Sequence, residues 1–138
     1  MALDHVNVYV IDEGDSWTII DTGFWSKKTL SIWKSIVEKY FENKPIGRVV
    51  VTHHHPDHVG LAGWFQKEYN ASLWMTRTAW LMARMLCLDE QKTPPPETLE
   101  FWTRAGMRLD ILEERKKGKP FNFADAVSAL PLGFRRIV

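Results

Sequence analysis

The sequence has little that would crosslink it, insert it into a membrane or attract it to a polyanion. It contains a single cysteine, Cys87, which excludes an internal disulfide and is typical of a reducing cytoplasm. No apolar run approaches the roughly 18 residues that a membrane helix needs, and the N-terminus lacks a signal-peptide pattern. The formal net charge of +1 gives no electrostatic reason to bind nucleic acid or anionic lipid. We therefore expect a cytoplasmic protein without a membrane or nucleic-acid partner.

Histidine is scarce as well, and it is unevenly placed. The chain has five histidines, and four of them lie between residues 53 and 58, directly after the apolar segment Val49–Val51. That segment reads as a buried strand. Extended backbone points alternate residues to the same side, so His53 and His55 can converge on one metal ion. The proline that follows breaks the extended course and lets Asp57 and His58 turn toward a second ion. The pattern predicts all or part of a dinuclear hydrolase site.

Two segments carry a resemblance to a known family. Thr52–Gly60 resembles the signature of the metallo-β-lactamase-fold superfamily. Upstream, Asn7–Ile11 and Trp17–Ile20 resemble the opening hairpin of that fold, and Asp21-Thr22-Gly23 resembles its Asp-Thr-Gly turn. The likeness is good over residues 5–75 and loose beyond. A histidine at position 58 resembles the glyoxalase II, lactonase and ribonuclease Z branches rather than the lactamase subclass that carries arginine there.

The resemblance implies a role for each residue of the motif. His53 and His55 would hold the first metal, and Asp57 and His58 the second, with zinc as the expected cofactor in one or two copies and iron or manganese as other choices. Asp57 would be catalytic, because it would orient the attacking hydroxide. Asp21 would accept a hydrogen bond from a ligand histidine and fix its tautomer. The structural alternatives are that Asp57 only caps the following helix and that Asp21 is only a turn residue.

Two other histidines stay outside the expected site. The side chain of His54 should point away from its neighbours in the motif. His5 lies at the start of an expected strand, where a structural role is the commoner one.

The expected fold class is α/β: half of an αββα metallo-β-lactamase sandwich, with a mixed sheet and flanking helices, followed by a helical cap-like region. Residues 1–76 would form the N-terminal half of the fold. Residues 77–138 would form a helical insertion or cap and the start of the next strand. The spacing of apolar and turn residues predicts strands at 5–12, 17–20, 46–51 and 71–75, and helices at 26–43 and 59–69.

Beyond Arg77 the pattern is nearly continuous helix. One amphipathic stripe runs from Trp80 to Leu88 and a second from Leu99 to Leu109, and Pro94–Pro96 forces a break between them. We expect this region to cover the metal and shape a substrate pocket. The alternative is a packing layer or an oligomer contact.

No histidine follows His58. The family pattern continues with a third histidine for the first metal, a bridging aspartate and a final histidine, so we expect a fragment, or a shortened relative, of a protein about twice as long. Its sheet face would then be exposed, which favours a homo-oligomer through that face or through the helical region. Its metal would be held weakly, because the number of ligands sets affinity.

The leading functional hypothesis is a metal-dependent hydrolase of small-molecule esters, thioesters or lactones that acts through a metal-activated water. The Met- and Trp-rich helical region favours an acyl-type small-molecule substrate. A phosphodiesterase or nuclease of the ribonuclease Z type is the second enzyme hypothesis, and a single-iron dioxygenase is the third. A non-catalytic truncated interaction module is the alternative outside the enzymes.

Overall fold

The protein is built on one mixed sheet. The computed structural model describes residues 5–131 and 135–137. Within this part of the chain the strands are ordered β1-β2-β3-β4-β5, which is also their order in the sequence. Their bounds are β1 Tyr9–Asp12, β2 Trp17–Ile20, β3 Ile46–Val50, β4 Ser72–Met75 and β5 Arg135–Ile137. The β1–β2 pair is antiparallel and the remaining pairs are parallel. The predicted α/β class with a mixed sheet is confirmed.

The first hairpin is shorter than expected. The strand begins at Tyr9 rather than His5, and Tyr9 pairs with Ile20 at the end of β2. The next residue, Asp21, has a φ of 59°, a left-handed backbone that turns the chain out of the sheet. Residues 5–8 therefore have no β2 residue opposite them. At the other end, Gly14 supplies a positive φ of 86° for the turn.

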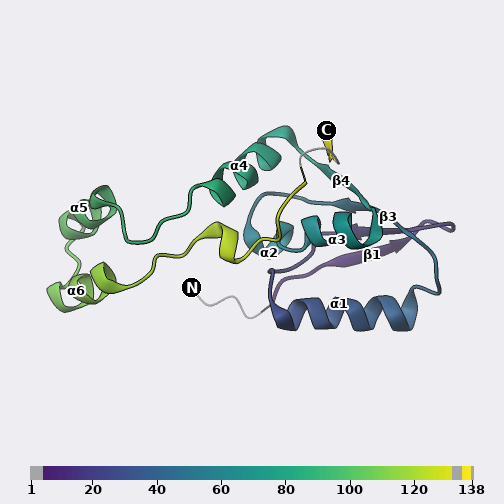
Figure 1. Cartoon of the computed structure of the whole chain (residues 1–138), viewed down its shortest axis with the longest axis horizontal. Coiled ribbons are helices and arrows are strands. Elements are labelled where there is room, and N and C mark those ends of the chain that lie inside the picture. Colours follow the sequence, from purple (N-terminus) through teal and green to yellow (C-terminus); the bar gives the residue numbers. More distant parts are fainter. Residues whose placement is uncertain (1–4, 132–134, 138) are drawn as a thin grey trace.

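Helix α1 (Lys27–Tyr40) runs alongside the sheet (Figure 1). Ser26 caps the helix, because its hydroxyl accepts a hydrogen bond from the Thr29 backbone N–H at 3.1 Å. The prediction placed the end of this helix at Asn43. It ends at Tyr40 because Glu42 and Asn43 both adopt left-handed backbone, with φ values of 47° and 63°.

The metal motif is followed by two helices, where the sequence predicted one. They are α2 (Pro56–Val59) and α3 (Ala62–Tyr69). Pro56 at the first helical position starts α2 three residues earlier than expected, since proline is preorganised for that position. The predicted stop at Asn70 is confirmed, because this residue takes a left-handed φ of 54°.

The second half of the chain contains α4 (Arg77–Leu88), α5 (Pro96–Arg104) and α6 (Leu109–Lys117), followed by a single 3-10 turn at Phe123–Asp125. Figure 1 shows α5 and α6 as a pair at the end of the molecule away from the sheet. The prolines separate α4 from α5, as predicted. The expectation of one stripe from Leu99 to Leu109 was wrong, because Gly106 takes a φ of 75° and ends the helix.

Residues from both halves of the chain form the core. Fully buried side chains of the sheet pack with Trp33 of α1, Phe65 of α3 and Ala83 of α4, and also with Phe123 and Val127 near the end of the chain. The segment around residue 128 is tied down by hydrogen bonds. Ser128 donates its N–H (2.7 Å) and its hydroxyl (2.8 Å) to the Gly60 carbonyl, and its hydroxyl accepts from the Trp64 N–H (3.1 Å).

The expected strand near the C-terminal end is present as β5, although residues 132–134 and 138 lie outside the described residues. Among the helices of the described chain, none is long and apolar enough to cross a membrane. The division at residue 76, the cap role of the helices and oligomerisation stay predictions.

Candidate metal site

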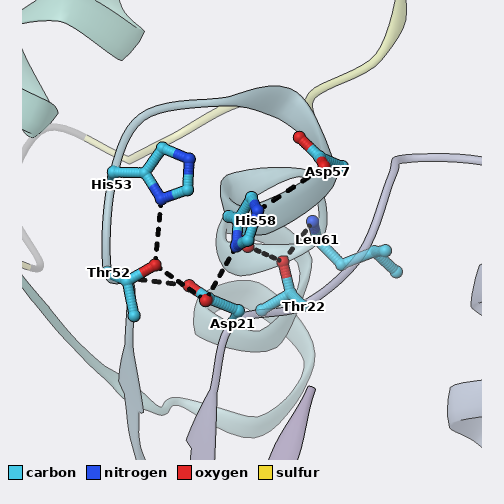
Figure 2. Close-up of polar contacts among 7 residues, drawn as sticks. All are labelled: Asp21, Thr22, Thr52, His53, Asp57, His58 and Leu61. Atoms are coloured by element: carbon cyan, nitrogen blue, oxygen red, sulfur yellow. Dashed lines mark hydrogen bonds and ion pairs between the residues drawn. The ribbon is translucent and has the colours of Figure 1, made fainter. Parts of the chain in front are cut away.

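The candidate site lies where β2 and β3 end. The two strands are parallel, so their carboxyl ends meet at one edge of the sheet. Asp21 and Thr22 follow β2, and Thr52 and His53 follow β3 (Figure 2). Topology therefore brings together two segments about 30 residues apart in the sequence.

Three of the motif histidines are packed against one another. The ring centroids of His53 and His58 lie 4.0 Å apart, and those of His53 and His55 lie 4.6 Å apart. The fold thus gathers the three imidazoles that the sequence predicted as metal ligands. His54, which we expected to point away, makes an edge contact with His55 at 5.0 Å between ring centroids.

Asp21 links the two strand ends through its carboxylate, which is almost fully buried. One oxygen, Oδ1, accepts a hydrogen bond from the Thr52 N–H (2.9 Å), and Oδ2 accepts one from the Thr52 hydroxyl (2.8 Å). Nδ1 of His58 lies 2.8 Å from Oδ2 of Asp21 (Figure 2). A carboxylate only accepts hydrogen bonds, so the proton of a neutral His58 belongs on Nδ1 and Nε2 keeps its lone pair. The contact expected of Asp21 is present; its effect on a metal ligand stays a prediction.

Asp57 lies beside the same imidazole. Its Oδ2 is 3.5 Å from Nε2 of His58. The N-cap residue of α2 is His55, and Asp57 belongs to the first turn, so the alternative in which Asp57 caps the helix is wrong. At this position its negative charge also interacts favourably with the helix dipole.

Thr22 anchors the helix that carries Asp57 and His58. Its N–H and its hydroxyl both donate to the His58 carbonyl, each at 2.8 Å, and its hydroxyl accepts a hydrogen bond from the Leu61 N–H at 2.9 Å. Thr22 is completely buried, so these bonds form away from water. In the sequence, only the place of Thr22 in the Asp-Thr-Gly turn points to such a role.

Gly60 permits the close contact between α2 and the Asp-Thr-Gly turn. A Cβ at this position would lie 2.2 Å from the Gly23 carbonyl oxygen and 2.6 Å from each of the Pro56 oxygen and the Trp25 nitrogen. All three are backbone atoms that cannot move aside cheaply. The absence of a side chain at Gly60 therefore allows α2 and the turn to pack this closely.

The pKa of His53 is lowered, mainly because partial burial disfavours the charged imidazolium and also because the His58 and His55 rings lie nearby. The carboxylates of Asp21 and Asp57 act in the opposite direction. The Nδ1 atom of His53 lies 3.0 Å from the Thr52 hydroxyl. A lowered pKa favours the neutral ring, which is the form that binds metals.

The donor types fit a zinc-type ion, since imidazole nitrogens and carboxylate oxygens are its usual ligands besides thiolate. His53, His55, Asp57 and His58 are the residues that would hold it. Across residues 5–131 and 135–137, however, no group of three or more His, Cys, Asp or Glu side chains is already arranged to hold a metal ion. The donors lie close together without forming an arranged metal site.

Comparison with known proteins places the chain in a family. The model of the metallo-beta-lactamase superfamily matches residues 1–123, so the protein belongs to that superfamily. The chain is similar over its whole length to a beta-lactamase domain protein from Burkholderia ambifaria, with 28% identity and a TM-score of 0.72. It covers 39% of that protein.

Two further matches are weaker, one because its sequence identity is lower and the other because it covers a shorter segment. A metallo-beta-lactamase family protein from Thermus thermophilus shares the fold, with a TM-score of 0.54 and 18% identity over 91% of this chain and 40% of its own. The alpha subunit of a 2,4-dinitroanisole O-demethylase from Nocardioides sp. (strain JS1661) is 31% identical over 72 residues. That match covers 52% of this chain and 22% of the subunit. The chain thus spans less than half the length of these relatives.

Proposed function

We propose that the protein is a metal-dependent hydrolase of small-molecule esters, thioesters or lactones, of the glyoxalase II and lactonase type. Its superfamily is generally hydrolytic. The observation that carries the proposal is the arrangement at the sheet edge, where the buried Asp21 carboxylate holds Nδ1 of His58 while Nε2 lies 3.5 Å from the Asp57 carboxylate. Such a carboxylate–histidine pair is the usual support of a metal ligand.

In this proposal His53, His55, Asp57 and His58 hold zinc. When bound, the ion would supply a water molecule of lowered pKa and would polarise the substrate carbonyl oxygen. Asp57 accepts a hydrogen bond from the attacking water and so fixes its direction. Asp21 keeps the proton of His58 on Nδ1, and Thr22 holds the helix that carries both Asp57 and His58.

A second candidate is cleavage of an aryl methyl ether. It is favoured by the likeness to the alpha subunit of the 2,4-dinitroanisole O-demethylase, whose name states that reaction. The same residues would serve it, since an ether cleaved by water also needs an oriented nucleophile.

A metal assay and a substrate panel test these candidates at the natural length of the protein. We expect zinc to bind in one or two equivalents and a thioester or a lactone to be cleaved. Asp57→Ala should lower kcat by about 10²–10⁴-fold, as expected for loss of a positioned acid–base group. Asp110→Ala is the matched control, because that carboxylate is exposed on α6 and forms an ion pair with Arg108.

The other outcomes of the panel are equally informative. Cleavage of 2,4-dinitroanisole alone would select the ether reaction. Cleavage of bis-p-nitrophenyl phosphate alone would select the phosphodiesterase hypothesis, which the net charge of +1 does not favour. Bound zinc with no turnover of any substrate, or unchanged turnover in Asp57→Ala, would contradict the proposed function.

A further inference from the structure

An open cavity of about 260 Å³ lies beside the candidate metal site. It is bounded by α1, by residues 5–8 and by the turn after β2, and Asp57 belongs to its lining. Asp57 is also the residue whose Oδ2 lies 3.5 Å from Nε2 of His58. The cavity and the histidine cluster are therefore joined through one carboxylate.

The wall of the cavity is mostly apolar. Its apolar lining consists of Val6, Val8, Phe24, Ile32, Trp33 and Ile36. Two of these remain open to solvent, with Phe24 40% exposed and Ile32 49% exposed. Large apolar side chains at the rim of a cavity next to a reactive site are typical of ligand pockets, where most lining is apolar and few polar groups fix orientation.

Several polar groups in the lining of the cavity already form hydrogen bonds within the protein. The Thr22 hydroxyl is engaged by the His58 carbonyl and the Leu61 N–H. The Trp33 indole N–H donates to the Thr22 carbonyl at 2.8 Å, which fixes that ring in the wall. The Asp57 carboxylate repels an anionic group. The apolar wall therefore favours an apolar occupant, and the Asp57 carboxylate disfavours an anionic one.

The volume limits the size of that occupant. About 260 Å³ equals the liquid volume of roughly nine water molecules at about 30 Å³ each. A linear acyl chain or a single aromatic ring of about six to nine heavy atoms fits this space, whereas a longer chain or a nucleotide would extend through the open side into solvent.

We propose that this cavity binds the uncharged apolar group of the substrate, a medium-length acyl chain or one aryl ring, and places the bond to be cleaved at Asp57. The inference rests on the proposed function. It adds that the protein selects substrates by an apolar group of limited size, held between α1 and the turn after β2.

Binding is tested apart from turnover, with 1-hexanol and benzyl alcohol as neutral probes in saturation-transfer NMR of the protein at its natural length. We expect binding of at least one probe. Ile32→Trp, which fills the open side of the cavity, should weaken it at least fivefold, and Ile32→Glu should do the same by adding charge. Leu81→Trp is the matched control on α4, since Leu81 is 54% exposed and does not line the cavity. Circular dichroism checks that each variant is folded.

Turnover provides the second arm. The kcat/KM for the S-hexanoyl ester of N-acetylcysteamine should exceed that for the S-acetyl ester about tenfold or more, because each methylene placed in an apolar pocket improves discrimination. The preference should fall in Ile32→Trp and persist in Leu81→Trp. Tighter binding of 1-hexanol than of benzyl alcohol would favour an acyl chain as the occupant, and the reverse order would favour an aryl ring.

The two arms separate this inference from the proposed function. Hydrolysis that shows no chain-length preference, together with probe binding that is insensitive to Ile32→Trp and Ile32→Glu, would overturn the cavity while leaving the hydrolase intact. Probe binding that both variants abolish, without turnover of any substrate, would support the cavity and defeat the proposed reaction.

Discussion

Replacing Thr22 with valine should destabilise the protein, whereas the same replacement at Thr18 should not. Thr18 lies in β2 and Thr22 lies just after it, and both are buried, with exposed fractions of 4% and 0%. Their hydroxyl groups differ. The Thr22 hydroxyl bonds the His58 carbonyl and the Leu61 N–H, whereas the Thr18 hydroxyl is buried with no hydrogen-bond partner among the described residues.

The size of the effect follows from the groups left without partners. In Thr22→Val the His58 carbonyl keeps its bond from the Thr22 N–H, so the group that loses its partner is the buried Leu61 N–H. An unsatisfied buried donor costs about 1–3 kcal/mol. In Thr18→Val an unpaired buried hydroxyl is replaced by a methyl group of similar size in a strand, so the change should be neutral or stabilising.

Urea unfolding followed by tryptophan fluorescence measures both variants, because the chain contains seven tryptophans. With a slope of about 1–3 kcal/mol/M, the midpoint of Thr22→Val should fall by about 1 M at a nearly unchanged slope. The midpoint of Thr18→Val should stay the same or rise. Equal losses in the two variants, or no loss in Thr22→Val, would refute the argument that the Thr22 hydroxyl anchors α2.

Three further predictions follow from particular contacts. Gly60→Ala should lower the free energy of unfolding by about 1–3 kcal/mol or more, because its Cβ would lie 2.2 Å from a backbone oxygen. Gly118→Ala is the control and should change this free energy little, because no atom lies closer than 3.6 Å to its Cβ. Thermal denaturation compares the two variants, and similar losses would contradict the steric argument. Asp21→Asn should weaken zinc binding about 10–100-fold, because the carboxylate that keeps the His58 proton on Nδ1 is lost. Titration with a competing chelator measures the zinc affinity, and an unchanged affinity would rule out this role of Asp21. Cys87 should react with iodoacetamide more slowly than free cysteine at pH 8, because burial raises the pKa of its thiol and leaves less thiolate. A profile of reaction rate against pH with its midpoint at or below that of free cysteine would contradict this prediction.

The elements that depend on neighbouring residues in the sequence were predictable. The Asp-Thr-Gly turn, the strands β2, β3 and β4 and the start of α1 each reflect the preferences of a few neighbouring residues in the sequence. Hydrophobic periodicity and turn chemistry report such short-range preferences directly. The histidine motif identified the superfamily for the same reason, because its donors lie within six residues.

The errors arose where a local pattern met a tertiary constraint. The apolar spacing from Leu99 to Leu109 is helical, yet Gly106 adopts the left-handed conformation and two short helices form instead. The strand expected from His5 has the right pattern over its first residues, but β2 ends opposite Tyr9 and offers no further partner. Periodicity cannot report whether a partner strand continues.

The surroundings of the site were the least accessible part. Asp21 and His58 are 37 residues apart, and only the parallel pairing of β2 and β3 brings them to 2.8 Å. The same pairing places Thr22 under α2. The cavity is lined by residues 5–8, by the turn after β2, by α1 and by Asp57 of α2, so no single motif indicates it.

The hydrogen bonds of Ser128 to Gly60 have a consequence for the order of events during synthesis. The two residues are 68 positions apart, so the ribosome needs about 3–14 seconds at about 5–20 residues per second to add the second after the first. During that interval the nascent chain already carries its histidines, but the serine that fastens the end of their helix does not yet exist. Making the histidine side chains and fixing their position are therefore separate steps in the life of each molecule.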